Sequence, residues 1–263
     1  MILDEIVRKK RLQLELEKQT LPLELLRREL TDLRPAGRFL GRFRKQGGDT
    51  GGNSVYGGNK VYGENGRIAV IAEVKRASPS KGVIAENFDY LGQAKKYEAL
   101  GAAGISVLTE RDYFQGKDEY LTEIRKAVGV PILRKDFIID EYQIHQSAKL
   151  GADCILLICR ILNDRELRNF SRLAKELGMD CLFEIHGEEE IGRAMAGGAE
   201  MIGINNRDLD TFRVDLDHSR RLGGKLPKGV IRISESGIRS RRELQQLEAW
   251  GFHGALIGEA LMR

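Results

Sequence analysis

The chain has 263 residues, of which 41% are hydrophobic and 31% charged, and its formal net charge is +4. These values are typical of a water-soluble globular protein that can bury a sizeable core, and they exclude disorder as its dominant state. Acids and bases are interspersed, and no apolar run approaches the roughly 20 residues of a membrane span, so we expect neither nucleic acid nor a membrane as a partner.

Two segments of helical period open the chain, at residues 3–18 and 21–30. We expect them to form an N-terminal helical extension that covers one mouth of the fold. The first residues carry acids where a secretory signal carries bases, which predicts a cytoplasmic protein. The basic run Arg8-Lys9-Lys10-Arg11 is typical of the solvated face of a helix.

Residues 46–66 are rich in glycine and polar residues. No strand leads into this segment, and no helix opens from it with the spacing of a nucleotide-binding loop, so a mobile linker is favoured over a phosphate loop. We therefore divide the chain into N-terminal helices at 1–45, a linker at 46–66 and the main fold at 67–263. All three parts are expected to belong to one domain, residues 1–263.

Beyond this linker, short β-branched apolar runs alternate with longer segments of helical period, as in successive βα units. The predicted strands are residues 69–75, 104–109, 131–135, 154–160, 181–186, 201–205, 230–235 and 254–258. Glycines that end the helices by adopting a left-handed conformation are expected at Gly101, Gly129, Gly151, Gly178, Gly198, Gly229 and Gly251. Eight near-continuous apolar strands predict an α/β fold, a parallel (β/α)8 TIM barrel, with a doubly wound open sheet as the alternative.

Charged side chains gather at the carboxyl ends of several predicted strands. Alternate residues of a strand face the same side, so Glu73 and Lys75 should point into the barrel near its mouth, as should Lys135 and Glu184. Lysines and glutamates in a low-dielectric site shift each other's pKa values and can serve as general acids and bases. A buried structural ion pair is the alternative for Glu73 and Lys75. His186 shares the face of Glu184, and we expect it to support the site without taking part in the chemistry.

The later strands end in groups that bind anions and hydroxyls. Asn205 and Arg207 supply an amide and a guanidinium at the end of the sixth predicted strand. Gly237 and Gly258 follow the seventh and eighth strands, where barrels build phosphate sites from backbone N–H groups. The cysteines lie in apolar runs and no cluster has metal-ligand spacing, so we expect no metal.

Five stretches of this sequence resemble indole-3-glycerol phosphate synthase. They are IAEVKRASPSKG at 71–82, LRKDF at 133–137, FEIH at 183–186, GINNRDL at 203–209 and SESG at 234–237. The likeness runs from the first helix to the last strand. It implies a carboxy-lyase of tryptophan biosynthesis that needs no cofactor. The reaction closes the ring of 1-(2-carboxyphenylamino)-1-deoxyribulose 5-phosphate to give indole-3-glycerol phosphate, with loss of carbon dioxide and water.

The resemblance also implies roles for individual residues. Lys135 would donate a proton to the ribulose carbonyl, Lys75 would bind the substrate as a second candidate donor, and Glu184 would serve the dehydration. The charge network around the reacting atoms would be held by Glu73, Asn205 and Glu235. Residues implied to bind the rest of the substrate are Ser78, Phe114, Phe137, Leu156, Arg207 and Leu209, and those implied to bind its phosphate are Ser236, Gly237, Gly258 and Glu259.

The sequence departs from the family pattern in two places. The segment at 46–66 is longer and richer in glycine than usual, and the sequence stops before the usual final helix, which predicts a gap in the barrel wall. Two other functions remain as alternatives: a barrel enzyme acting on a related phosphosugar, and a non-catalytic binding barrel. The expected partner is a phosphorylated small molecule. We expect a monomer that associates weakly with other enzymes of the tryptophan pathway.

Overall fold

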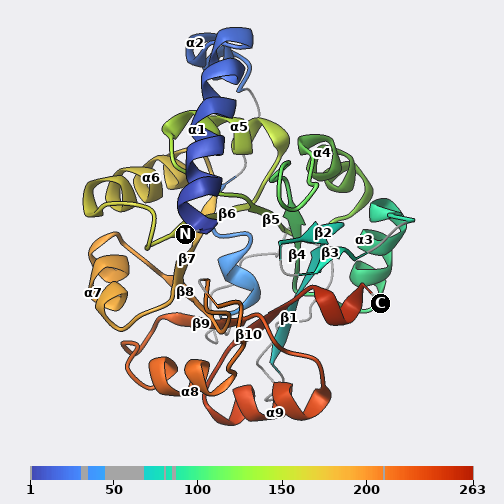
Figure 1. Cartoon of the computed structure of the whole chain (residues 1–263), viewed down its shortest axis with the longest axis vertical. Coiled ribbons are helices and arrows are strands. Elements are labelled where there is room, and N and C mark those ends of the chain that lie inside the picture. The colour runs from blue at the N-terminus through green and yellow to red at the C-terminus, as the bar shows by residue number, and fades with distance from the viewer. Residues whose placement is uncertain are drawn as a thin grey trace, which may run out of the picture.

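The computed structural model describes residues 2–30, 35–44, 68–79, 81–84, 87–209 and 211–262. Within them, parallel strands close into a barrel in the order β1-β10-β9-β8-β7-β6-β5-β4, with helices around the outside (Figure 1). The strands are β1 (Ala69–Val74), β4 (Gly104–Leu108), β5 (Ile132–Lys135), β6 (Cys154–Ile158), β7 (Asp180–Ile185), β8 (Met201–Asn205), β9 (Ile231–Glu235) and β10 (Gly254–Ile257). Since β1 pairs with both β4 and β10, the predicted TIM barrel is confirmed and the open sheet is wrong.

The outer layer consists of helices that follow the strands. They are α3 (Tyr90–Ala99), α4 (Asp118–Ala127), α5 (Glu141–Leu150), α6 (Asp164–Glu176), α7 (Glu189–Ala196), α8 (Asp217–Gly223) and α9 (Arg241–Ala249). Asn163 and Ser240 open α6 and α9 with reciprocal capping bonds to Glu166 and Glu243. No helix among the described residues is both long and apolar enough to cross a bilayer.

Five of the glycines predicted to end helices have a positive φ just after one: Gly101, Gly151, Gly178, Gly198 and Gly251. Two predictions were wrong. Gly129 is not among the glycines with positive φ, because Val128, the residue that caps α4, is already extended. Gly229 has a φ of 88°, yet it lies in the turn before β9, well after α8 has ended.

The N-terminal helices α1 (Ile2–Thr20) and α2 (Leu23–Arg28) form the predicted extension. The expectation that the whole basic run is solvated was wrong, because Lys10 is only 2% exposed. Lys10 shares the buried face of α1 with Leu3, Ile6 and Leu14, at the three- and four-residue spacing of a helix. That spacing was visible in the sequence, but it did not reveal a partner for the charge.

The amino-terminal mouth of the barrel is closed by a short plug, the residues around the 3₁₀ turn η1 (Leu40–Arg42). Phe39 and Phe43 are buried there beneath the barrel. A Cβ on Gly104 or Gly254 would come within 2.8 Å of their rings, so the plug fits only because those strands begin with glycine. The carboxylate of Asp180 accepts backbone N–H bonds from the plug at 2.9 Å. The predicted linker at 46–66 lies outside the described residues.

Short elements complete the carboxyl-terminal mouth. A hairpin of β2 (Ala77–Ser78) and β3 (Gly82–Val83) follows β1, and a 3₁₀ turn, η2 (Glu259–Leu261), follows β10. Inside the barrel, Ile71, Leu133 and Leu182 belong to one buried apolar cluster. Because side chains alternate along a strand, the inward residues two positions later are Glu73, Lys135 and Glu184.

Replacing Phe39 with Ala tests the plug. Phe39 is fully buried, so the cavity left behind should lower the free energy of unfolding by about 3–5 kcal/mol. Urea denaturation followed by circular dichroism measures this change. The control is Leu12→Ala on α1, which is 59% exposed and should change stability by no more than about 0.5 kcal/mol. Equal effects of the two changes would contradict the packing of the plug.

Candidate active site

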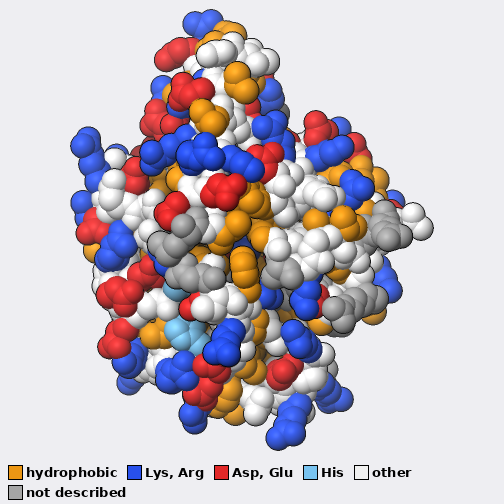
Figure 2. Space-filling view, in the orientation of Figure 1, with side chains coloured by type: hydrophobic (Ala, Val, Ile, Leu, Met, Phe, Trp, Pro, Cys, Tyr) orange, Lys and Arg blue, Asp and Glu red, His pale blue; other side chains and the backbone are white. Residues whose placement is uncertain are grey.

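The carboxyl ends of the strands surround one pocket, where hydrophobic side chains gather in the centre of the face shown in Figure 2. The structure brings every site residue named from the sequence into its lining. They are Glu73, Lys75, Ser78, Phe114, Lys135, Phe137, Leu156, Glu184, Asn205, Arg207, Leu209, Glu235, Ser236, Gly237, Gly258 and Glu259. Their placement together is a finding, while their individual roles remain predictions.

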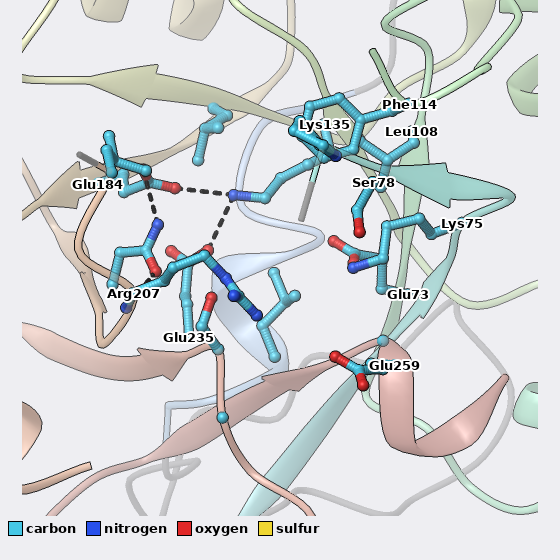
Figure 3. A pocket seen from close by; sticks show the side chains of 18 of the residues that line it. Glu73, Lys75, Ser78, Leu108, Phe114, Lys135, Glu184, Arg207, Glu235 and Glu259 are labelled. Carbon is cyan, nitrogen blue, oxygen red and sulfur yellow. Dashed lines mark hydrogen bonds and ion pairs between the residues drawn. The ribbon is translucent and has the colours of Figure 1, made fainter. Parts of the chain in front are cut away.

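Lys135 stands at the centre of the charged part of the pocket (Figure 3). Its Nζ donates to Glu184 Oε2 at 2.8 Å and to Glu235 Oε2 at 2.9 Å. These three side chains come from β5, β7 and β9 and are 14%, 4% and 2% exposed. Alternate barrel strands therefore deliver one cation and two carboxylates to a site that is nearly closed to water.

The two glutamates that contact Lys135 have pKa values shifted in opposite directions. Burial, reinforced by the negative charges of Glu184 and Glu73, raises the pKa of Glu235 to about 7, against the opposing effect of Lys135. Burial also disfavours ionisation of Glu184, but Lys135, His186 and Asn205 together hold the pKa of Glu184 below its usual value. For Lys135, burial is outweighed by the surrounding carboxylates, which raise its pKa. Near neutral pH the cluster thus contains a stable ammonium, a carboxylate and a carboxyl close to its titration midpoint.

A second ion pair lies across the pocket, where Lys75 Nζ donates to Glu73 Oε1 at 2.6 Å. Two glycines make room for the glutamates. A Cβ on Gly258 would collide with the Glu73 carboxylate, and a Cβ on Gly203 would collide with Glu235 Oε1. The latter oxygen has no hydrogen-bond partner among the described residues, which accords with a carboxyl group that is readily protonated.

Asn205 orients Glu184 from the next strand. Its Nδ2 donates to Glu184 Oε1 at 3.2 Å, while its Oδ1 accepts the backbone N–H of Arg207 at 3.0 Å. His186 Nε2 lies 3.5 Å from the same Glu184 oxygen and is not part of the pocket lining. The supporting position expected for His186 agrees with this geometry.

One end of the pocket is apolar. The rings of Phe114 and Phe137 lie 6.2 Å apart between centroids, with Leu156 and Leu209 also in the lining. Glu110 holds the loop that carries Phe114, because its buried carboxylate accepts the backbone N–H of Phe114 at 3.0 Å and that of Tyr113 at 2.7 Å. Sequence reasoning missed further lining residues from α1, namely Ile2, Leu3 and Ile6. Their apolar spacing was visible, but it did not say which mouth α1 would cover.

The opposite end is built from backbone turns after β9 and β10. Ser236 and Gly237 have φ values of 68° and 81°, and a Cβ on Gly237 would collide with Val214. Asn206 holds this turn by donating to Ser234 Oγ at 2.9 Å and to the carbonyl of Ser236 at 3.1 Å. Glu259 begins η2 at the rim (Figure 3). Among the described residues, no group of three or more His, Cys, Asp and Glu side chains is arranged to hold a metal.

The pKa of Glu235 predicts a measurable titration. Since its pKa is raised, the neutral form should persist until the pH reaches about 7, and its carboxylic acid C=O stretch in infrared difference spectra should disappear through that pH. The band should be absent in Glu235→Gln. In Glu184→Gln the midpoint should fall, because a negative charge that raises the pKa has been removed. A Glu235 carboxyl that titrates near 4.5 would contradict the arrangement.

The chain is similar to known proteins of one family. The family model for indole-3-glycerol phosphate synthase matches residues 57–263. Proteins of that name from Lachnoclostridium phytofermentans and Acetivibrio thermocellus are 44% and 45% identical to the chain, matching 100% of it and 94% and 95% of their own lengths. Among solved structures, an N-acetylmannosamine-6-phosphate 2-epimerase from Clostridium perfringens shares only the fold. Its TM-score is 0.57 at 16% identity, over 73% of this chain and 87% of that one. The chain belongs to the indole-3-glycerol phosphate synthase family.

Proposed function

We propose that this protein closes the ring of 1-(2-carboxyphenylamino)-1-deoxyribulose 5-phosphate to form indole-3-glycerol phosphate, releasing carbon dioxide and water. The observation that carries the proposal is the Lys135 ammonium between Glu184 and Glu235, 2.8 and 2.9 Å from their carboxylates. It lies in a pocket with one apolar end and one end built from glycine turns, which suits a substrate with an aromatic ring at one end and a phosphate at the other.

The two ends of the pocket orient the substrate. The aromatic ring lies between Phe114 and Phe137, with Leu156 and Leu209 around it. The phosphate lies against the turns formed by Ser236, Gly237, Gly258 and Glu259, where backbone N–H groups serve as donors. Ser78 and Arg207 bind the carboxylate and hydroxyl groups between these ends. Held at both ends, the substrate presents its ribulose carbonyl to Lys135.

Ring closure begins when the aromatic carbon that carries the carboxylate attacks the ribulose carbonyl carbon. The carbonyl oxygen gains negative charge, and Lys135 donates a proton to it, leaving an alcohol. The carboxylate then leaves as carbon dioxide, and its bonding electrons return to the ring. The positive charges of Lys75 and Lys135 stabilise the developing negative charge in a site that excludes water.

Dehydration completes the indole. The new hydroxyl leaves as water after accepting a proton from a neighbouring acid, for which Lys75 is positioned across the pocket. Glu184, which remains ionised at neutral pH, accepts the proton that the intermediate loses as the ring becomes aromatic. Glu73, Asn205 and Glu235 keep the lysines and Glu184 in place through the contacts described above.

A turnover assay tests the proposal directly. Purified protein given the aminodeoxyribulose phosphate should produce the fluorescence of an indole and one equivalent of carbon dioxide per product. The reaction should proceed equally well in the presence of a metal chelator. Tight binding of the substrate without product at saturation would reject the proposal and favour a non-catalytic barrel.

Changing Lys135 to Met tests the role of the general acid. The variant keeps a side chain of similar length but cannot donate a proton, so kcat should fall by about 100-fold or more. Lys126→Met provides a control on the exposed face of α4 and should retain the wild-type kcat. A mild effect at Lys135 together with a large effect of Lys75→Met would move the first proton transfer to Lys75.

A further inference from the structure

The helix α1 lies over the mouth of the barrel, outside the residues that the family model matches. Figure 1 shows its first turn above the strands and its other end extending beyond the rim of the barrel. Ile2, Leu3 and Ile6 from this first turn line the pocket. Leu3 and Ile6 are 6% and 4% exposed, so the pocket side of α1 is firmly packed.

One buried ion pair fastens α1 at this place. Lys10 Nζ lies 2.8 Å from Asp136 Oδ1, and both side chains are 1% exposed. On the same helix, Lys9 lies over the ring of Tyr113, 4.7 Å from its centroid. Lys10 therefore fastens α1 to the end of β5, and Lys9 contacts the loop that carries Phe114.

Asp136 connects this ion pair to both sides of the aromatic end. Its Oδ1 also accepts the backbone N–H of Phe137 at 2.8 Å. Its Oδ2 accepts from Thr109 Oγ1 at 2.6 Å, at the start of the loop that carries Phe114. A single carboxylate thus holds Lys10, the backbone of Phe137 and the strand end that leads to Phe114.

We infer that Lys10 is a positioning residue for the aromatic ring of the substrate. Through Asp136 it holds the first turn of α1 as a third wall of the ring site, facing Phe114 and Phe137. This inference rests on the proposed function for the identity of the ring. A buried charge is costly unless it is paired, so the contact with Asp136 fixes where α1 lies more closely than a solvated lysine could.

The test compares two ligands in Lys10→Met. One is the substrate with its ribulose carbonyl reduced to an alcohol, which keeps the aromatic ring but cannot undergo ring closure. The other is ribitol 5-phosphate, which lacks the ring. In calorimetric titrations, Lys10→Met should bind the reduced substrate about tenfold more weakly or worse, because apolar contacts with the ring are lost. Its affinity for ribitol 5-phosphate should match that of the wild type.

Lys18→Met is the matched control. Lys18 is on the same helix and pairs with Asp140 at 2.7 Å, but both side chains are about one-third exposed and neither lines the pocket. The affinity of the Lys18→Met variant for the reduced substrate should differ from that of the wild type by less than about threefold. Equal weakening by Lys10→Met and Lys18→Met would overturn the inference, because it would show a general effect of loosening α1.

A second variant keeps the inference testable if Lys10→Met does not fold. Leu3→Ala shortens the wall and leaves the buried ion pair intact. It should also weaken binding of the reduced substrate without weakening binding of ribitol 5-phosphate. Unchanged affinity in Leu3→Ala would overturn the inference. In active preparations the selective loss should appear as a higher KM with a smaller change in kcat.

Because both ligands bind without turnover, a failure of the proposed function is distinguished from a failure of this inference. A wild-type protein that binds the reduced substrate but forms no product rejects only the proposed reaction. Normal turnover in Lys10→Met, with an unchanged KM, rejects only the role of Lys10. No binding of the reduced substrate by the wild type rejects both.

Discussion

The site depends on one electrostatic constraint, which is that three buried carboxyl groups are paired with only two lysines, both of them largely buried. Glu73, Glu184 and Glu235 face Lys75 and Lys135 in a pocket that excludes most of the water. With every group ionised, the cluster would hold one excess negative charge in a medium that solvates it poorly. Protonation of Glu235 near pH 7 removes that excess. The same arrangement that stabilises the cluster therefore supplies a group able to exchange a proton at physiological pH.

The barrel imposes this constraint because alternate side chains along each strand point into its interior. Apolar residues fill its interior below the site, and the next inward positions carry the charges. Glycine matters where a glutamate side chain lies directly against the backbone of a neighbouring strand or strand end. Gly203 and Gly258 leave space for the carboxylates of Glu235 and Glu73, so the chemistry depends on side chains that are absent as well as on those present.

The local pattern was sufficient to predict the barrel, its strands and the charged side chains at the strand ends, because strand alternation and helix ends are encoded over a few residues. The residues of the aromatic end, such as Phe114 and Leu156, were named only through the family resemblance. The packing of α1 against residues far along the chain could not be predicted in the same way. The apolar stripe of α1 was recognised, but nothing in it indicated that Leu3 would face the carboxyl-terminal mouth. The burial of Lys10 depended on Asp136, which lies far along the chain. The prediction at Gly129 was wrong because Val128, which caps α4, is already extended, so this helix ends without a left-handed residue.

The plug at the amino-terminal mouth also constrains how the chain is assembled. Phe43 packs against Gly254, in the last strand, and the plug's backbone is held by Asp180 on β7. During synthesis, Phe39 and Phe43 are made before the strands that they pack against, so the packing site of the plug is complete only when β10 is available. Until then Phe43 lacks its contact with β10, and unprotected apolar surface of this kind favours aggregation. The packing of the plug is therefore complete only after β10 has been synthesised.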